Sequence, residues 1–275
     1  MKIISLGLGV QSTTLYYLSS MGIIERADFA VFADPGAESE ETYKYLNYLQ
    51  NWQKRNNGIE IMIRNEKSIY KDIMQKADTG SRFASIPGFT LNEDGSTGML
   101  RRQCTAEYKI TEVYKGIRLL QGLRKGQRYK PTQIWIGITL EESHRAKDSR
   151  EKWATNVYPF LNHPFNFLPR PWTRANCISF LEENNLPIPP KSSCVFCPYQ
   201  SPSRWKKTMQ NAREREIVVN VDNAIRDMSM KGLRAPVFLT SHCLPIEKVN
   251  FQNIPDDLFG NECEGYCGLS CSFLY

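Results

Sequence analysis

The sequence lacks any apolar run of the roughly 18 residues that a membrane-spanning helix requires. The apolar start of the chain is broken by Gly7, Gly9, Gln11 and Ser12 before it reaches the length of a signal-peptide core. Cys271 stands five residues from the end rather than four, so a prenylation box is also missing. We therefore expect a cytoplasmic protein with no membrane partner.

Repeats and low-complexity tracts are also lacking, and apolar residues (41%) and charged residues (23%) occur at ordinary globular frequencies. This composition excludes disordered and fibrous proteins. A chain of 275 residues can bury a full core, and we expect a main domain with an appendage. The net charge of +6 suits a polyanionic partner such as a nucleotide or RNA, although it is also common in plain cytosolic enzymes.

Strand and helix patterns alternate along the first half of the chain. The predicted elements are strand 2–5, helix 12–21, strand 29–33, helix 39–53, strand 59–63, helix 105–120 and strand 133–138. Strands that alternate with helices predict an α/β fold with a parallel, doubly wound sheet and helices on both faces.

Two segments depart from this alternation. Residues 79–98 are rich in Gly, Ser, Asp and Asn and have no period, which predicts a loop that acts as a lid or is a solvated insertion. Proline becomes frequent after Pro159, where layered α/β packing gives way to irregular structure. We predict a nucleotide-binding domain at 1–160 and a helical, Cys-rich irregular region at 161–275.

A Gly-rich loop follows the first strand, with Ser5, Gly7, Gly9 and then Gln11-Ser12-Thr13 leading into a helix. Such a turn suits phosphate, because the helix start offers unpaired N–H groups and glycines allow positive φ and close backbone approach. The hydroxyls of Ser12 and Thr13 add donors. The loop lacks the Gly-Lys-Ser/Thr of a Walker A motif and the third Gly of a dinucleotide-binding motif, and an ordinary tight turn is the alternative interpretation.

This loop resembles the PP-loop of the ATP pyrophosphatase superfamily, whose usual form is Ser-Gly-Gly-x-Asp-Ser, and it is closest to the sulfonucleotide (PAPS) reductase-like branch. Gln11 stands where the usual form has Asp. The resemblance implies an adenine nucleotide, ATP with Mg²⁺ or an adenylyl sulfate, bound over the loop.

Three further segments extend the resemblance. Asp34 and Gly36 stand in a segment like the one with which the family holds base and ribose, and Arg102 and Lys109 in a block like the one whose cations meet the phosphates or sulfate. Gly137 and Arg145 frame a third similar segment, in which Thr139 replaces an Arg. The implied catalytic residues are Ser12, Lys109 and Arg145. For Lys109 and Arg145 the alternative is a solvated surface charge.

Eight cysteines without an export signal predict reduced thiols that bind metal or do chemistry. Cys194 and Cys197 form C-x-x-C, and Cys263 and Cys267 form a second pair near the end of the chain, so these four are the predicted metal ligands. Spacing leaves a [4Fe–4S] cluster, structural zinc and inert or redox thiols open, and the family resemblance favours iron. The roles of Cys104 and Cys271 stay open, whereas Cys177 and Cys243 are expected to be buried.

Three functions follow from this reading. The first is adenylyl transfer from ATP with release of pyrophosphate, coupled to sulfur transfer from a sulfur donor or to modification of a tRNA or DNA base, which the basic runs 118–130 and 204–207 suit. The second is a sulfonucleotide reductase that uses a thiol reductant, although the tail around Cys263 and Cys267 matches that family's only in part. The third is a nucleotide sensor without catalysis.

Overall fold

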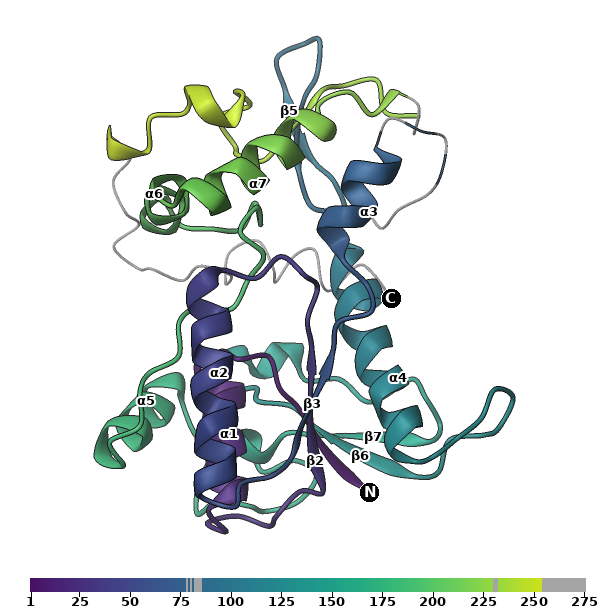
Figure 1. Cartoon of the computed structure of the whole chain (residues 1–275), viewed down its shortest axis with the longest axis vertical. Coiled ribbons are helices and arrows are strands. Elements are labelled where there is room, and N and C mark those ends of the chain that lie inside the picture. Colours follow the sequence, from purple (N-terminus) through teal and green to yellow (C-terminus); the bar gives the residue numbers. More distant parts are fainter. Residues whose placement is uncertain (78, 80, 82–85, 230–231, 254–275) are drawn as a thin grey trace. The chain divides into compact units, whose positions relative to one another are not determined.

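The computed structural model describes residues 1–77, 79, 81, 86–229 and 232–253 (Figure 1). These residues fall into two compact units that are interleaved along the chain. Unit 1 comprises Met1–Asp34, Glu40–Asn65 and Ile110–Ser192, and unit 2 comprises the remaining segments. The predicted boundary at residue 160 falls inside unit 1. In the described residues, no helix is both long and apolar enough to cross a membrane.

Unit 1 is built on a five-stranded parallel sheet, as the alternation of strands and helices predicts. Its strands run in the order β3-β2-β1-β6-β7. Their bounds are β1 Lys2–Ser5, β2 Phe29–Ala33, β3 Ile61–Arg64, β6 Thr132–Trp135 and β7 Ala154–Val157. The strand order reverses between β1 and β6, and in open α/β sheets this reversal is the place where ligands bind, beyond the carboxyl ends of the strands.

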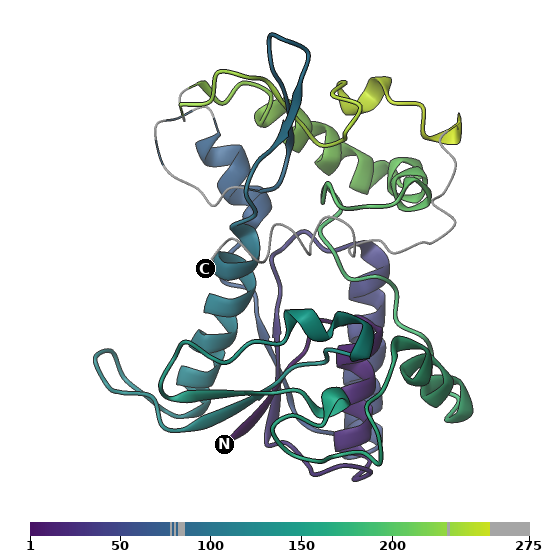
Figure 2. The ribbon, with the colours of Figure 1, turned by 180° about the vertical axis from the view of Figure 1, so that it is seen from behind.

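Helices cover both faces of this sheet (Figures 1 and 2). On one face lie α1 Val10–Ser20 and α2 Glu40–Arg55, with α5 Arg174–Glu183 packed against α1, and on the other lies α4 Thr111–Leu120. Ile3 and Ile4 are adjacent in sequence and both fully buried, because neighbouring strand residues point to opposite faces and each face has its own core.

Some predicted bounds shift by a few residues. Helix α1 begins at Val10, two residues before the predicted start, and β6 ends at Trp135 rather than Ile138. The chain bends after β6, where the N–H of Ile138 donates to the carbonyl of Ile136. Two 3₁₀ turns, η2 Leu140–Arg145 and η3 Pro159–Leu161, follow in unit 1.

Unit 2 carries a three-stranded antiparallel sheet in the order β5-β4-β8, together with helices that share one apolar core. Its elements are α3 Ile69–Lys76, β4 Phe89–Leu91, β5 Thr97–Met99, α6 Pro202–Gln210, α7 Ala212–Ala224, β8 Val237–Phe238, η5 Ile246–Lys248 and η6 Phe251–Asn253. The π-helical turn η1 Thr105–Ile110 begins the predicted helix 105–120. Trp205, Val218 and Val221 are buried in the core of unit 2.

The prediction of a loop over 79–98 is wrong for its second half, because residues 89–99 form the β4–β5 hairpin. Its turn is closed by the N–H of Asn92, which donates to the carbonyl of Ser96 at 2.9 Å, and Gly95 takes φ +80°. The strands are three residues long, too short to show a period. Phe89 pairs with Phe238, so the hairpin's sheet depends on a segment far along the chain.

Candidate functional site

The loop after β1 leads into α1 with an uncapped helix start. Gly9 is the N-cap residue, and no side chain caps the helix. Among the described residues, the N–H groups of Val10, Gln11 and Ser12 have no acceptor. The Ser12 hydroxyl accepts the N–H of Gly7 at 3.1 Å and donates to the carbonyl of Gly9 at 3.3 Å, so its two hydrogen bonds hold the loop backbone against the start of α1. The first turn of α1 therefore offers N–H donors and the positive end of the helix dipole.

The residue with left-handed backbone in this loop is Leu8, at φ +57°, and not Gly7 or Gly9 as the sequence suggests. For a leucine this conformation costs about 1 to 2 kcal/mol. Its side chain is fully buried in the core, which holds the strained turn in place. Gly9 has φ −91°, and a Cβ there would meet no heavy atom within 4 Å, so the space in front of Gly9 is open.

The loop after β6 packs directly on the first turn of α1. A Cβ on Gly137 would lie 2.8 Å from the backbone nitrogen of Ser12 and 2.9 Å from the carbonyl carbon of Gln11. Real Cβ atoms do not approach backbone this closely, so position 137 requires glycine. The loop after β1 and the loop after β6 are therefore in contact where the strand order reverses.

Two buried hydroxyls at this edge are unsatisfied. Thr13 and Thr139 are both fully buried, and neither hydroxyl has a hydrogen-bond partner in the part of the chain that the structure describes. An unsatisfied buried hydroxyl costs about 1 to 3 kcal/mol. Thr13 lies in the first turn of α1, and Thr139 comes two residues after Gly137. Such groups call for a ligand or water as their partner.

A polar network joins α1 to η2. The amide nitrogen of Gln11 donates to Oε2 of Glu142 at 3.1 Å, and Nη1 of Arg145 forms an ion pair with Oε1 of the same carboxylate. The Glu142 side chain is 15% exposed and that of Arg145 is 40% exposed. Glu142 is not among the predicted site residues. The signal was its position three residues before Arg145, a spacing at which helical side chains meet.

The end of β2 adds a carboxylate. The N–H of Asp34 donates to the carbonyl of Arg64, and its Oδ1 accepts the hydroxyl of Tyr43 at 2.9 Å. Nine of the predicted site residues thus lie at or after the carboxyl ends of β1, β2 and β6 in unit 1: Ser5, Gly7, Gly9, Gln11, Ser12, Thr13, Asp34, Gly137 and Arg145.

The other three predicted nucleotide-binding residues belong to unit 2. Gly36 has φ +71°, and a Cβ there would lie 2.9 Å from the hydroxyl of Ser68, so glycine is required. The guanidinium of Arg102 lies over the ring of Tyr199, 5.8 Å from its centroid. Lys109 occupies a more buried position.

Lys109 forms an ion pair with Glu38 at 3.1 Å, and the Glu38 side chain is fully buried. The backbone of Glu38 bridges to Cys194, and the N–H of Val195 donates to the carbonyl of Ala37. Burial acts to lower the pKa of Lys109, but Glu38 and Cys194 beside it outweigh that effect and raise the pKa above its usual value. Lys109 is therefore a fixed positive charge beside a thiol.

The C-x-x-C segment forms a tight turn, with the N–H of Cys197 donating to the carbonyl of Cys194 at 2.9 Å. Burial, and after it the Glu38 carboxylate, raises the pKa of the Cys194 thiol well above its usual value, and Cys104 lies close enough to contribute to the same shift. Cys104 directly precedes η1, and π-helical turns are frequent at functional sites.

Within the described residues, no group of three or more His, Cys, Asp or Glu side chains is arranged to hold a metal ion. The predicted ligands Cys263 and Cys267, and also Cys271, lie outside the described residues, so the four-sulfur site stays a prediction. Cys177 and Cys243 are buried, as expected.

No known protein-family model matches this chain, and no curated protein is significantly similar to it. The functional conclusion therefore depends on the geometry and chemistry of the residues themselves.

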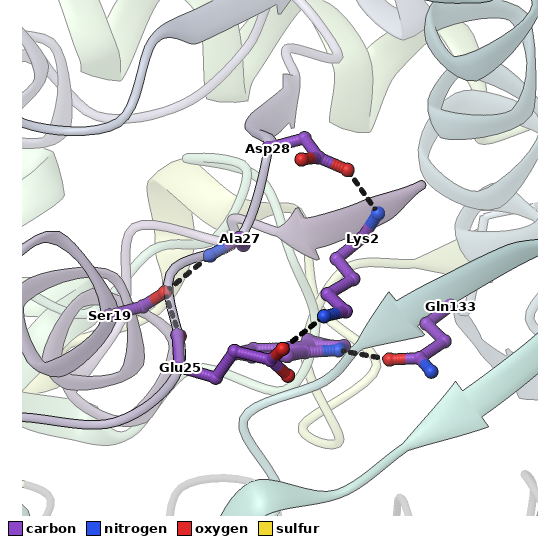
Figure 3. A network of polar contacts seen from close by, with 7 residues as sticks. Lys2, Ser19, Glu25, Ala27, Asp28 and Gln133 are labelled. Carbon is purple, nitrogen blue, oxygen red and sulfur yellow. Dashed lines mark hydrogen bonds and ion pairs between the residues drawn. The ribbon is translucent and has the colours of Figure 1, made fainter. Parts of the chain in front are cut away.

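Unit 1 also has an open hollow of about 720 Å³ on the opposite side, at the amino ends of β1 and β6. Its charges are already engaged. The Lys2 ammonium pairs with Glu25, and the N–H of Lys2 donates to Asp28 (Figure 3). The guanidinium of Arg26 donates to two backbone carbonyls. The amide oxygen of Gln133 accepts the indole N–H of Trp135. The charged side chains that line this hollow are thus already paired within the protein.

Proposed function

We propose that unit 1 binds the phosphates of an adenine nucleotide at the first turn of α1, and that the protein is a PP-loop-type enzyme. In the proposed reaction, a substrate oxygen attacks the α-phosphorus of ATP. The bond from that phosphorus to the bridging oxygen breaks, so that the substrate carries AMP and pyrophosphate leaves. The observation that carries the proposal is the set of N–H groups on Val10, Gln11 and Ser12, which lie where the strand order reverses and have no acceptor in the described part of the chain.

The surrounding residues fit a polyphosphate. The open space in front of Gly9 admits an anion close to the backbone, and the unsatisfied hydroxyls of Thr13 and Thr139 offer donors. Arg145 supplies a cation. Mg²⁺ that arrives with ATP would neutralise part of the phosphate charge. The choice of adenine comes from the family resemblance of the loop.

The loop departs from the family form in two ways that have opposite electrostatic effects. Gln11 replaces an acid, which removes a negative charge from the first turn of α1 and favours an anionic ligand. Thr139 replaces an Arg, which removes a positive charge from the loop after β6. Arg145 is therefore the cation that remains in the segment Gly137–Arg145.

We propose that unit 2 holds a [4Fe–4S] cluster on Cys194, Cys197, Cys263 and Cys267, with zinc as the alternative. Two thiols on one tight turn suit either centre, and the positive charge of Lys109 beside Cys194 offsets part of the burial that disfavours the thiolate form a metal requires. The cluster would hold a sulfur atom or organise the site. Sulfur transfer to a tRNA or DNA base is the reaction that combines both centres.

Titration calorimetry with ATP, ADP, AMP and adenosine in the presence of Mg²⁺ tests the nucleotide site. We expect affinity to rise with the number of phosphates. Gly9→Ala is the sharpest variant, because its Cβ meets nothing in the protein but occupies the space proposed for phosphate. It should melt like the wild type and bind ATP at least tenfold more weakly. Equal affinity for ATP and adenosine would refute phosphate binding here.

Assays of turnover distinguish the reactions. Pyrophosphate release from ATP supports adenylyl transfer, sulfite release from an adenylyl sulfate supports the reductase, and tight binding without turnover supports a sensor. Protein purified without oxygen should be brown and absorb near 400 nm through sulfur-to-iron charge transfer. A colourless protein that contains zinc would replace the cluster with a structural site.

A further inference from the structure

The first turn of α1 has a neutral amide, Gln11, at the position where the loop form it resembles carries an acid. That amide is not free in solvent. It donates to the carboxylate of Glu142, which comes 131 residues later in the chain, from η2 in the loop after β6. A carboxylate is thus present beside this turn, although it belongs to another segment.

Both oxygens of Glu142 are engaged. Oε2 accepts from Gln11 at 3.1 Å and Oε1 pairs with Arg145, while the side chain is largely shielded from solvent. Arg145 uses Nη1 for this pair, and its remaining N–H groups have no partner among the described residues. Glu142 therefore fixes one edge of the guanidinium to α1 and leaves the other donors available.

We propose that Glu142 is a positioning residue that takes over the acidic position from the opposite loop and holds Arg145 beside the first turn of α1, where its free donors address the phosphates. This inference rests on the proposed nucleotide site and names the residue that orients its cation, Arg145.

The competing explanation is an ordinary surface pair between residues three apart in sequence. Such pairs contribute little, and their loss leaves a distant ligand site unaffected. The two explanations differ in one measurable quantity, which is the dependence of affinity on the phosphates of the ligand. If Glu142 positions Arg145, its removal weakens the binding of ATP and spares the binding of adenosine. If its removal instead damages the loop, both ligands bind more weakly.

The experiment compares Glu142→Gln, Arg145→Gln and the double variant by calorimetric titration of the full chain with ATP–Mg²⁺ and with adenosine. We expect each single variant to bind ATP about tenfold more weakly, and the double variant to lose no more than either alone, because both changes remove the same oriented cation. Adenosine affinity should stay within twofold. Glu25→Gln is the matched control, since it breaks the Lys2 ion pair at the opposite edge of the sheet (Figure 3).

An exchange of the two side chains gives a second readout. Gln11→Asp should weaken ATP binding by placing two carboxylates together, and Gln11→Asp with Glu142→Gln should restore at least part of it. Wild-type ATP affinity in Glu142→Gln, equal losses for ATP and adenosine, or no recovery in the exchanged pair would overturn the inference while leaving the nucleotide site intact. Failure of the wild type to bind ATP would instead remove the proposed function, and this inference with it.

Discussion

The polar groups at the first turn of α1 in unit 1 and those of the Lys109–Glu38 pair in unit 2 differ in whether they have partners within the protein. At α1, N–H groups and two buried hydroxyls have no partner among the described residues. In unit 2, a buried carboxylate and an ammonium neutralise each other. Donors without a partner can bind an anion from outside. A pair in which the carboxylate neutralises the ammonium can instead hold that ammonium in a fixed position beside the thiols. The contrast supports the proposals that the first region binds a ligand and that the second supports the thiols.

The largest expected effect comes from breaking the pair in unit 2. Glu38→Ala leaves Lys109 charged and two-thirds buried without its carboxylate, which should lower the free energy of unfolding by about 2 kcal/mol. Chemical denaturation measures this loss. Glu25→Ala, which removes an exposed partner of Lys2, is the control and should leave stability nearly unchanged. Equal effects in the two variants would mean that the buried pair has no special role.

Gly137→Ala tests the packing of the two loops in unit 1. In this variant the Cβ would lie 2.8 Å from the backbone nitrogen of Ser12. A backbone atom cannot move aside by changing rotamer, so the loop must shift, at a cost of about 1 to 3 kcal/mol. ATP affinity should fall at least tenfold because the N–H groups of α1 are displaced. A variant with unchanged melting temperature and unchanged ATP affinity would contradict the observed close approach.

Thr139→Val separates binding from stability at the same site. Removal of an unsatisfied buried hydroxyl should leave the free protein equally stable or stabilise it by up to about 1 kcal/mol, since no hydrogen bond is lost. ATP should nevertheless bind more weakly if that hydroxyl serves the ligand. Melting curves recorded with and without ATP report both quantities, and destabilisation of the free protein would mean that the hydroxyl is already satisfied.

The smallest effect concerns a second carboxylate in unit 2. Burial acts to raise the pKa of Asp72, but hydrogen bonds from Lys76 and Tyr108 outweigh it and lower the pKa. Because the folded pKa lies below the unfolded value, the stabilisation is present above about pH 4 and is lost as pH falls through the folded pKa. Asp72→Asn should therefore be less stable than the wild type by about 1 kcal/mol at pH 7, and the gap should close on acidification. A gap that does not narrow at all as the pH falls below 4 would assign the loss to packing.

Much of unit 1 could be predicted from the sequence, because its signals are local. Apolar runs such as 29–33, alternating with helical periods, mark the parallel sheet, and the glycines after β1 and β6 mark the loops at its carboxyl edge. Unit 2 was not predicted as a unit. Its short strands show no period, and β4 pairs with β8 from a segment more than a hundred residues later.

The features of the candidate site also divide into those that follow from local sequence and those that follow from tertiary contacts. Residue types and short-range order are enough to predict phosphate binding at Gly7–Thr13, since glycines, hydroxyls and a helix start act within a few residues of one another. Tertiary structure decided which residue carries the strain, Leu8 rather than a glycine, because burial of its side chain compensates the backbone. It also decided that Gln11 meets Glu142 and that Glu38 meets Lys109, since these contacts exist only once distant segments have packed.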